Sequence, residues 1–186
     1  ESLVTQLREA NAALIAHSYT DALTGLPNRR AIFEDLTTLF SLARHLKRNA
    51  IIAFIDLDDF KLINDRYGHE AGDQFLIEVG KRLTEEKQQD DIIGRLGGDE
   101  FLVASLSQPH QDGDNAQLTL LKTRLSACIA GEYWLGSVHI IYPGASFGVI
   151  EVDPAATDPD SALRAADVAM YQDKKGKSKS RFLTID

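Results

Sequence analysis

The sequence predicts a mixed α/β domain (α/β or α+β in class) with helices flanking a central sheet of about five strands. Stretches with the helical period alternate along the chain with short apolar runs that are typical of buried strands. The length of 186 residues suits one domain with a short appendage, and its 44% hydrophobic and 26% charged residues are ordinary for a globular protein. We therefore expect an N-terminal linker helix at residues 1–18 and one domain at residues 19–186.

Composition narrows the classes of partner. The net charge of −8 argues against a general nucleic-acid binder, but it allows a nucleotide, because metal ions can supply positive charge locally. No apolar run approaches the ~20 residues of a membrane span, so we expect no membrane contact from this segment. The single cysteine, Cys128, excludes an intramolecular disulfide and favours a cytoplasmic location. The chain begins with Glu1 rather than methionine, which indicates a piece of a longer protein.

The first segment has the spacing of a coiled-coil seam. Leu3, Leu7, Ala10 and Leu14 recur at intervals of four, three and four residues. The segment is therefore either the end of a coiled coil that enters the domain, or an isolated amphipathic helix packed on it. Two heptads do not decide between these alternatives.

The first half of the domain alternates helical and extended patterns. Turn formers at 24–28 precede a helix expected from Arg29 to Arg48, and a continuous apolar run predicts a buried strand at 51–56. A second helix carries its apolar face on Phe75, Leu76, Val79 and Leu83, and a hairpin spans roughly 91–106. The expected inner face of the first helix comprises Ile32, Phe33, Leu36, Leu39, Phe40 and Leu46.

The second half continues the alternation. A polar loop at 108–115 leads to a helix with an apolar stripe from Leu118 to Ile129. Two strands, at 138–142 and 145–152, are separated by a Pro-Gly turn. A last helix is expected at Ser161–Lys174, and a short edge strand at 182–185.

Two acidic clusters stand at strand ends. Asp56 and Asp58 follow the buried strand and, by strand alternation, share one face, while Leu57 points away. Asp99 and Glu100 follow a Gly-Gly turn in the hairpin, where glycine accepts a positive φ. Alone, this hairpin tip could be a solvated acidic turn. If it lies beside the strand, the carboxylates converge, and their oxygen-only chemistry favours Mg²⁺ or Mn²⁺ in a phosphate-handling site.

Five strings occur in order along the chain: DALTGLPNRR (21–30), FIDLDDFKLINDRYGHEAGD (54–73), RLGGDEF (95–101), SFGV (146–149) and AADVAMYQDKK (165–175). Together they resemble the GGDEF family of diguanylate cyclases from Asp21 to about Lys179. The resemblance implies a fold like the palm of nucleotide cyclases and polymerases, with a ferredoxin-like core. It also implies condensation of two GTP molecules into cyclic di-GMP and pyrophosphate. The members that look most alike carry an upstream GAF sensory domain.

The resemblance implies a metal site. It assigns Asp56, the backbone carbonyl of Leu57, Asp99 and Glu100 to two Mg²⁺ (or Mn²⁺) ions per active site. Asp99 also matches the proton acceptor; since a free aspartate has a pKa of about 3.9, it suits an already acidified hydroxyl better than a free one. Lys61 matches a lysine that stabilises the transition state. In isolation it would be a surface lysine.

The resemblance also implies a guanine site. Asn64 and Asp73 match the residues that read the base, and His69 matches a residue of the substrate site. Their groups suit guanine, because Asp73 can accept from N1–H and the amino group, and Asn64 can accept and donate. Taken alone, Asn64 could be a capping residue and His69 could bond backbone groups of its turn. A buried Asp73 would discriminate against ATP on the order of 10⁴-fold.

The chain departs from the family at two places. The inhibitory product site RxxD has its aspartate at Asp91, but Gln88 replaces the arginine, so product inhibition is expected to be weak or absent. The family's phosphate-binding Ala-Lys-x-x-Gly-Arg-Asn is replaced by the run Asp173 to Lys179. Lys174 matches the lysine, whereas Ser178 occupies the arginine position. Lys177 or Lys179 could substitute as a point charge.

The product joins two guanosines, whereas one domain offers one guanine pocket. We therefore expect a homodimer with two domains face to face, each with a bound GTP. One rival interpretation is a degenerate domain that binds GTP or cyclic di-GMP as a sensor or scaffold. Another is an unrelated metal-dependent phosphohydrolase that uses the same carboxylates.

Overall fold

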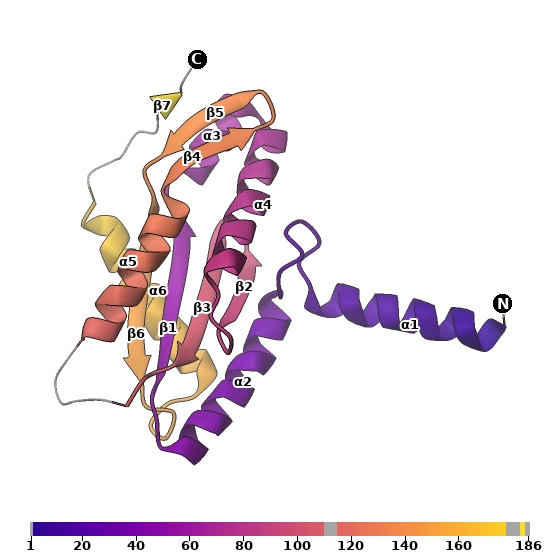
Figure 1. Ribbon diagram of the computed structural model, residues 1–186, viewed down its shortest axis with the longest axis vertical. Helices are drawn as coiled ribbons and strands as arrows, with labels where there is room; N and C mark the ends of the chain where they lie inside the picture. The colour runs from indigo at the N-terminus through magenta and orange to yellow at the C-terminus, as the bar shows by residue number, and fades with distance from the viewer. Residues whose placement is uncertain (1, 110–114, 178–182, 185–186) are drawn as a thin grey trace.

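The computed structural model describes residues 2–109, 115–177 and 183–184. The elements, in order, are α1 (Leu3–Tyr19), α2 (Arg29–Leu46), β1 (Ala50–Leu57), α3 (Phe60–Tyr67), α4 (His69–Glu86), β2 (Ile92–Gly97), β3 (Glu100–Leu106), α5 (Ala116–Ile129), β4 (Gly131–Leu135), β5 (Val138–Tyr142), β6 (Ala145–Val152), α6 (Pro159–Lys175) and β7 (Leu183–Thr184). The expected mixed α/β class is confirmed (Figure 1).

The strands form two sheets rather than one sheet of about five strands. The central sheet has the order β2-β3-β1-β6, and the small sheet has the order β4-β5-β7; all pairs are antiparallel. The turn at Pro143-Gly144 joins β5 to β6, but these strands belong to different sheets. The expected edge strand at 182–185 is present as β7 on the small sheet, while Phe182 and Ile185 lie outside the described residues.

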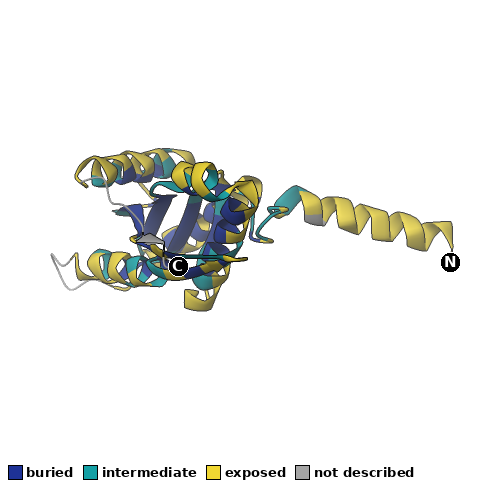
Figure 2. Cartoon of the chain, turned by 90° about the horizontal axis from the view of Figure 1, so that it is seen from above, coloured by how far each residue is buried: buried dark blue, intermediate teal, exposed yellow. Residues whose placement is uncertain are grey.

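The central sheet separates two cores. Alternate residues of β1 face opposite sides: Ile51 and Ile55 join the core with α4 and α5, and Ile52 and Phe54 join the core with α2 and α6. Burial on both faces explains the continuous apolar sequence of this strand. The layers are visible from above in Figure 2, where buried strands lie between the helices.

Two elements were not expected from the sequence, α3 and β4. The helix α2 begins as predicted, with the Asn28 side chain accepting a hydrogen bond from the Ala31 amide at 3.0 Å. It ends at Leu46 rather than Arg48, because Lys47 adopts a left-handed conformation with φ 54°. Phe33 and Leu46, which we expected in the core, are exposed.

At Gly148 the backbone of α6 lies close against the sheet. A Cβ atom at this position of β6 would lie 2.0 Å from the Ala166 carbonyl oxygen and 2.4 Å from the Met170 nitrogen. Glycine is therefore required here by space, since the helix backbone occupies the volume of a side chain. The contact brings α6 close to β6, opposite Phe54 of β1.

Helix α1 extends away from the rest of the molecule (Figure 2). Its apolar residues Leu3, Leu7 and Leu14 are 79%, 69% and 69% exposed. The seam that the spacing predicts is therefore not covered by the domain, which excludes the alternative of a helix packed along the domain surface. Among the described residues, no helix combines the length and hydropathy that crossing a membrane requires.

Candidate active site

The two acidic clusters meet at one end of the central sheet. Asp56 is directly opposite Glu100 in the register of β1 and β3. The Leu57 amide donates a hydrogen bond to the Asp99 carbonyl oxygen at 3.1 Å. The expected proximity of the strand end and the hairpin tip is confirmed, and Asp56, Asp99 and Glu100 form the carboxylate end of the sheet.

Burial and mutual repulsion act on these carboxylates. Asp56 is 8% exposed, and its pKa is raised by burial and then by the nearby charge of Asp99. The pKa of Glu100 is raised by burial and then by Asp56 and Asp167. Both groups therefore hold their negative charge less readily than ordinary carboxylates, which is the condition that a bound cation relieves.

A lysine supplies part of the missing positive charge. The Lys174 ammonium donates a hydrogen bond to Asp56 Oδ1 at 3.1 Å. Burial alone would lower the pKa of Lys174, but the hydrogen bond and charge of Asp56 outweigh it and raise the pKa. Within residues 2–109, 115–177 and 183–184, no three His, Cys, Asp or Glu side chains are assembled closely enough to hold a metal ion. The oxygen donors are of the type that a hard divalent cation prefers, whereas Lys174 supplies a counter-charge and not a ligand.

Asp58 stands beside this cluster and is held from three sides. Its carboxylate accepts from the Ser146 hydroxyl at 2.7 Å and from the Lys177 ammonium at 3.2 Å. Its backbone carbonyl accepts from the Tyr142 hydroxyl at 2.7 Å. Asp56 thus contacts Lys174 in the last turn of α6, and Asp58 contacts Lys177 just after the helix ends.

The hairpin of β2 and β3 is stabilised by Arg95, to which the sequence analysis assigned no role. Its guanidinium donates to the Gly98 carbonyl at 2.7 and 3.0 Å and to the Asp21 carboxylate at 2.9 and 3.0 Å. Burial would raise the pKa of Asp21, but hydrogen bonds from Thr24 and Arg95 outweigh it and lower the pKa. Asp21 and Arg95 are 74 residues apart in sequence, so no local pattern pairs them.

The expected guanine residues lie on the two helices after β1. Asn64 is half-buried on α3, while His69 and Asp73 are exposed on α4. A Cβ atom at Gly72 would lie 1.8 Å from Asn64 Oδ1, so the glycine gives the amide its place against α4. The expectation of a buried Asp73 is wrong for the structure without ligand, because α4 presents this residue to solvent.

The remaining predicted residues are Lys61, Gln88, Ser178 and Lys179. Lys61 is exposed in the first turn of α3. Ser178 and Lys179 lie outside the described residues. Gln88 is in the turn before β2, where its backbone N–H donates to Asp91 Oδ2 at 3.0 Å. The Asp91 carboxylate therefore accepts a hydrogen bond from within this turn and stabilises it.

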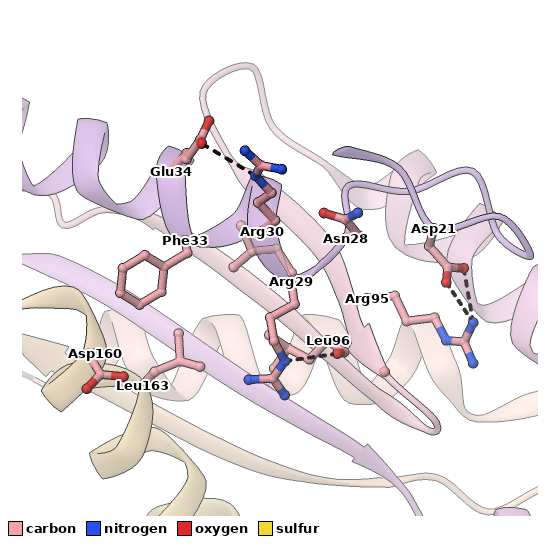
Figure 3. Close-up of a pocket in the computed structure, with 12 residues that line it drawn as sticks. Asp21, Asn28, Arg29, Arg30, Phe33, Glu34, Arg95, Leu96, Asp160 and Leu163 are labelled. Atoms are coloured by element: carbon pink, nitrogen blue, oxygen red, sulfur yellow. Dashed lines mark hydrogen bonds and ion pairs between the residues drawn. The ribbon is translucent and has the colours of Figure 1, made fainter. Parts of the chain in front are cut away.

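A groove of about 800 Å³ lies beside the hairpin, between α2 and α6 (Figure 3). Phe33, Leu96 and Leu163 contribute apolar surface, and Arg29 donates to the Leu96 carbonyl at 3.3 Å. None of the predicted substrate residues lines this groove. We therefore locate the site at the carboxylate end of the sheet, where the charged groups converge, and not in this groove.

The comparison with family models decides the class of this site. The model of the diguanylate cyclase GGDEF domain matches residues 18–180. The chain belongs to the GGDEF family of diguanylate cyclases. The GGDEF domain is 65% identical over 183 residues to diguanylate cyclase DgcP of Escherichia coli K12, covering 98% of this chain and 52% of that protein. It thus spans about half the length of this relative.

Solved structures agree with the fold of the GGDEF domain. A sensory box/GGDEF family protein from Caulobacter crescentus matches with a TM-score of 0.78 and 31% identity, over 86% of this chain and 99% of that one. The coiled coil and GGDEF domain of DgcB from the same organism, in complex with c-di-GMP, matches with a TM-score of 0.79 and 25% identity, over 95% and 91% of the two chains.

Proposed function

We propose that this GGDEF domain condenses two GTP molecules into cyclic di-GMP, releasing two pyrophosphates, as a Mg²⁺-dependent dimer of domains. The observation that carries the proposal is the meeting of Asp56, Asp99 and Glu100 at one sheet end, with Lys174 on Asp56. The resemblance that assigns these residues as ligands is supported by their oxygen-only chemistry and their repulsion. GTP as the substrate and a cytoplasmic location belong to the same proposal.

The chain's own groups have separable tasks in this reaction. Asp56, the Leu57 carbonyl, Asp99 and Glu100 would hold two Mg²⁺ or Mn²⁺ ions, which supply activation of the attacking oxygen and stabilisation of the leaving charge. Asp99 would accept the proton of the 3′-hydroxyl. Lys174 and Lys61 would contact the phosphates, and the first turn of α3 offers backbone amides to them.

The guanine base would be read by Asn64 and Asp73, with His69 at the start of α4. Asp73 is exposed to solvent, so water would be removed from its carboxylate only when the guanine base binds. Specificity for guanine would therefore arise on binding and would be smaller than a preformed, dry pocket allows.

Incubation of the purified domain with GTP and Mg²⁺ tests the proposal. We expect cyclic di-GMP and pyrophosphate, separated by chromatography. Binding of GTP without turnover would instead identify a degenerate domain, and release of orthophosphate without a dinucleotide would identify a phosphohydrolase. Omission of the metal provides the control.

A further inference from the structure

The last turn of α6 is tied to the rest of the domain by a residue that departs from the family pattern. Asp173 stands where the family motif has alanine, immediately before Lys174. Its side chain is 20% exposed and has partners on two other elements. Its contacts connect the edge of the central sheet with Lys174 and Lys177.

The first contact is with the edge of the central sheet. β6 is an edge strand, so half of its amides have no neighbouring strand. The Phe147 amide donates to Asp173 Oδ2 at 2.8 Å, which satisfies one of these donors. Because the acceptor is ionised, this hydrogen bond is stronger than one between neutral groups.

The second contact is with α5, which lies on the other face of the central sheet. The Lys122 ammonium on α5 donates to Asp173 Oδ1 at 2.8 Å. α5 and α6 lie on opposite faces of the sheet, so this pair closes around the edge of β6 (Figure 1). Burial would raise the pKa of Asp173, but the hydrogen bonds from Lys122 and the Phe147 amide outweigh it and lower the pKa.

The third set of contacts leads to the active site. Lys177, one turn after Asp173, lies 3.8 Å from its carboxylate and 3.2 Å from that of Asp58, and it also donates to the Ala145 carbonyl. Lys177 lines a hollow of about 470 Å³ with Asp58 and Ala145. Lys174, the next residue after Asp173, donates to Asp56. The turn that Asp173 anchors thus presents both lysines to the acidic end of β1.

We propose that Asp173, neutralised by Lys122, is a positioning residue that fixes the last turn of α6 so that Lys174 and Lys177 face the phosphates of GTP. The inference rests on the proposed function for the identity of the substrate. It explains how this chain can bind a triphosphate with Ser178 at the family's arginine position: a fixed helix end compensates for the loss of a planar, bidentate group. Asp173 itself is not expected to touch GTP.

The direction in which Asp173→Asn changes the KM for GTP distinguishes a positioning role of Asp173 from a purely electrostatic one. Asp173→Asn removes a negative charge near an anionic substrate, which would by itself strengthen GTP binding. If Asp173 positions the lysines, the KM for GTP instead rises about 5-fold to 10-fold, with kcat within about twofold of wild type. An unchanged or lowered KM would overturn the proposal.

Lys122 provides a second, independent variant on the surface. Lys122→Met should raise the KM about 3-fold to 5-fold, and the double variant should be no weaker than Asp173→Asn alone, because the two residues act through one contact. Lys175→Met is the matched control: it removes the same charge from the same region, but its ammonium lies over the Tyr171 ring at 4.8 Å. Additive effects of Lys122→Met and Asp173→Asn, or an equal effect of Lys175→Met, would contradict the proposal.

A binding measurement distinguishes failure of this inference from failure of the proposed function. Calorimetry with a non-hydrolysable GTP analogue and Mg²⁺ should show weakened binding in Asp173→Asn, while inhibition by guanosine, which lacks phosphates, should be unchanged. If the wild type binds the analogue but makes no cyclic di-GMP, the proposed function fails and the positioning test still stands. Equal losses for the analogue and guanosine would show a general structural defect and overturn the inference.

Discussion

Asp56 is a buried carboxylate of the site whose pKa is raised by burial and by its neighbours. It is buried, it lies opposite Glu100, and its charge is opposed by Asp99 and balanced in part by Lys174. Such an arrangement is unfavourable for an empty domain, because ionised carboxylates repel one another. A bound cation would relieve this repulsion, so on the proposed mechanism the residues that destabilise the metal-free domain are those that would hold the metal.

A change in the hairpin carboxylates should separate activity from stability. Glu100→Gln or Asp99→Asn should lower cyclic di-GMP formation at least ~100-fold, since a metal ligand is lost. Because the pKa of Glu100 is raised, its ionised form destabilises the folded state, and stability falls as pH rises through that pKa. Glu100→Gln should therefore raise the Tm of the metal-free domain at pH 7 by about 1–2 °C, measured by calorimetry.

The metal itself supplies the control for this prediction. Mg²⁺ or Mn²⁺ should raise the Tm of the wild type and leave that of Glu100→Gln nearly unchanged. Near wild-type turnover in either variant would refute the assignment of the hairpin tip as a metal site.

Asp73 allows a test of base selection without disturbance of the core. Asp73→Ala should raise the KM for GTP about 10-fold to 100-fold and reduce the preference for GTP over ATP, because the base loses an acceptor. Its effect on folding should stay within ~0.5 kcal/mol, since the residue is exposed. Glu70→Ala, an exposed carboxylate in the same helix, is the control. An unchanged ratio of the two nucleotides would place guanine recognition elsewhere.

At the scale of elements, Arg95 connects the segment after α1 to the catalytic hairpin. Asp21→Asn should lower the unfolding free energy by about 1–2 kcal/mol at pH 7, because Arg95 loses a charged partner in a largely buried place. The pKa of Asp21 is lowered, so its stabilisation is present above the ordinary pKa and is lost as pH falls through the folded value. The difference between variant and wild type should therefore shrink below about pH 4 in chemical denaturation.

Glu85→Gln, which changes an exposed carboxylate on α4, is the matched surface control. Asp21→Asn should also reduce turnover more than Glu85→Gln, as Arg95 would hold the Gly98 carbonyl less firmly. A constant difference across the pH range would mean that the ion pair is not the source of the stability.

The turn before β2 bears on product inhibition. The Gln88 side chain carries no charge, and the Asp91 carboxylate already accepts a hydrogen bond from the backbone N–H of Gln88. Added cyclic di-GMP should therefore cause little non-competitive inhibition of the wild type, measured as initial rate against product concentration, and Gln88→Arg should increase it. Strong inhibition of the wild type, with product bound near Asp91, would contradict this expectation.

The sequence predicted those parts of the fold that depend on local pattern. β1 was recognisable because burial on both faces makes it continuously apolar, and the hairpin because Gly97-Gly98 interrupts two extended runs. α3 was missed because only Ile63 of its eight residues is buried, so it has no apolar stripe. The division into two sheets depends on where β5 and β6 find partners, which the Pro-Gly turn does not encode.

For the candidate site, too, residues with a local sequence pattern could be predicted, and contacts between distant elements could not. Asp56, Asp99 and Glu100 could be predicted because carboxylates at a strand end and a glycine turn are unusual locally. The Asp21–Arg95 pair and the Lys122–Asp173 pair could not, because each joins elements that only the tertiary fold brings together. The exposure of Asp73 likewise depends on how α4 packs.

At the scale of the whole molecule, the exposed seam of α1 predicts dependence on concentration. On the proposed mechanism two domains meet to join two guanosines, so the isolated domain should show specific activity that rises with protein concentration. Fusion of a parallel leucine zipper before Leu3 should raise activity at low concentration about 10²-fold, since it raises the effective concentration of the second domain. Activity assays over a dilution series, with sedimentation to follow dimers, measure this.

The phase of the fusion gives the control. Insertion of one residue between zipper and Leu3 turns the domain by about 100° and should reduce the gain. Specific activity that is independent of concentration, with no gain in any phase, would rule out domain encounter as the limiting step and would refute the regulatory role of residues 1–18.

The close contact at Gly148 has a mechanical consequence. Since the backbone of α6 rests directly on β6, this helix cannot slide or tilt against the sheet without a collision of main-chain atoms. On this basis we expect α6, with Lys174, to move together with the central sheet, with Asp56. On the proposed mechanism, a torque that arrives through α1 turns α6 and the sheet as a unit, and an upstream sensor would set how often two catalytic centres face each other while leaving each centre unchanged.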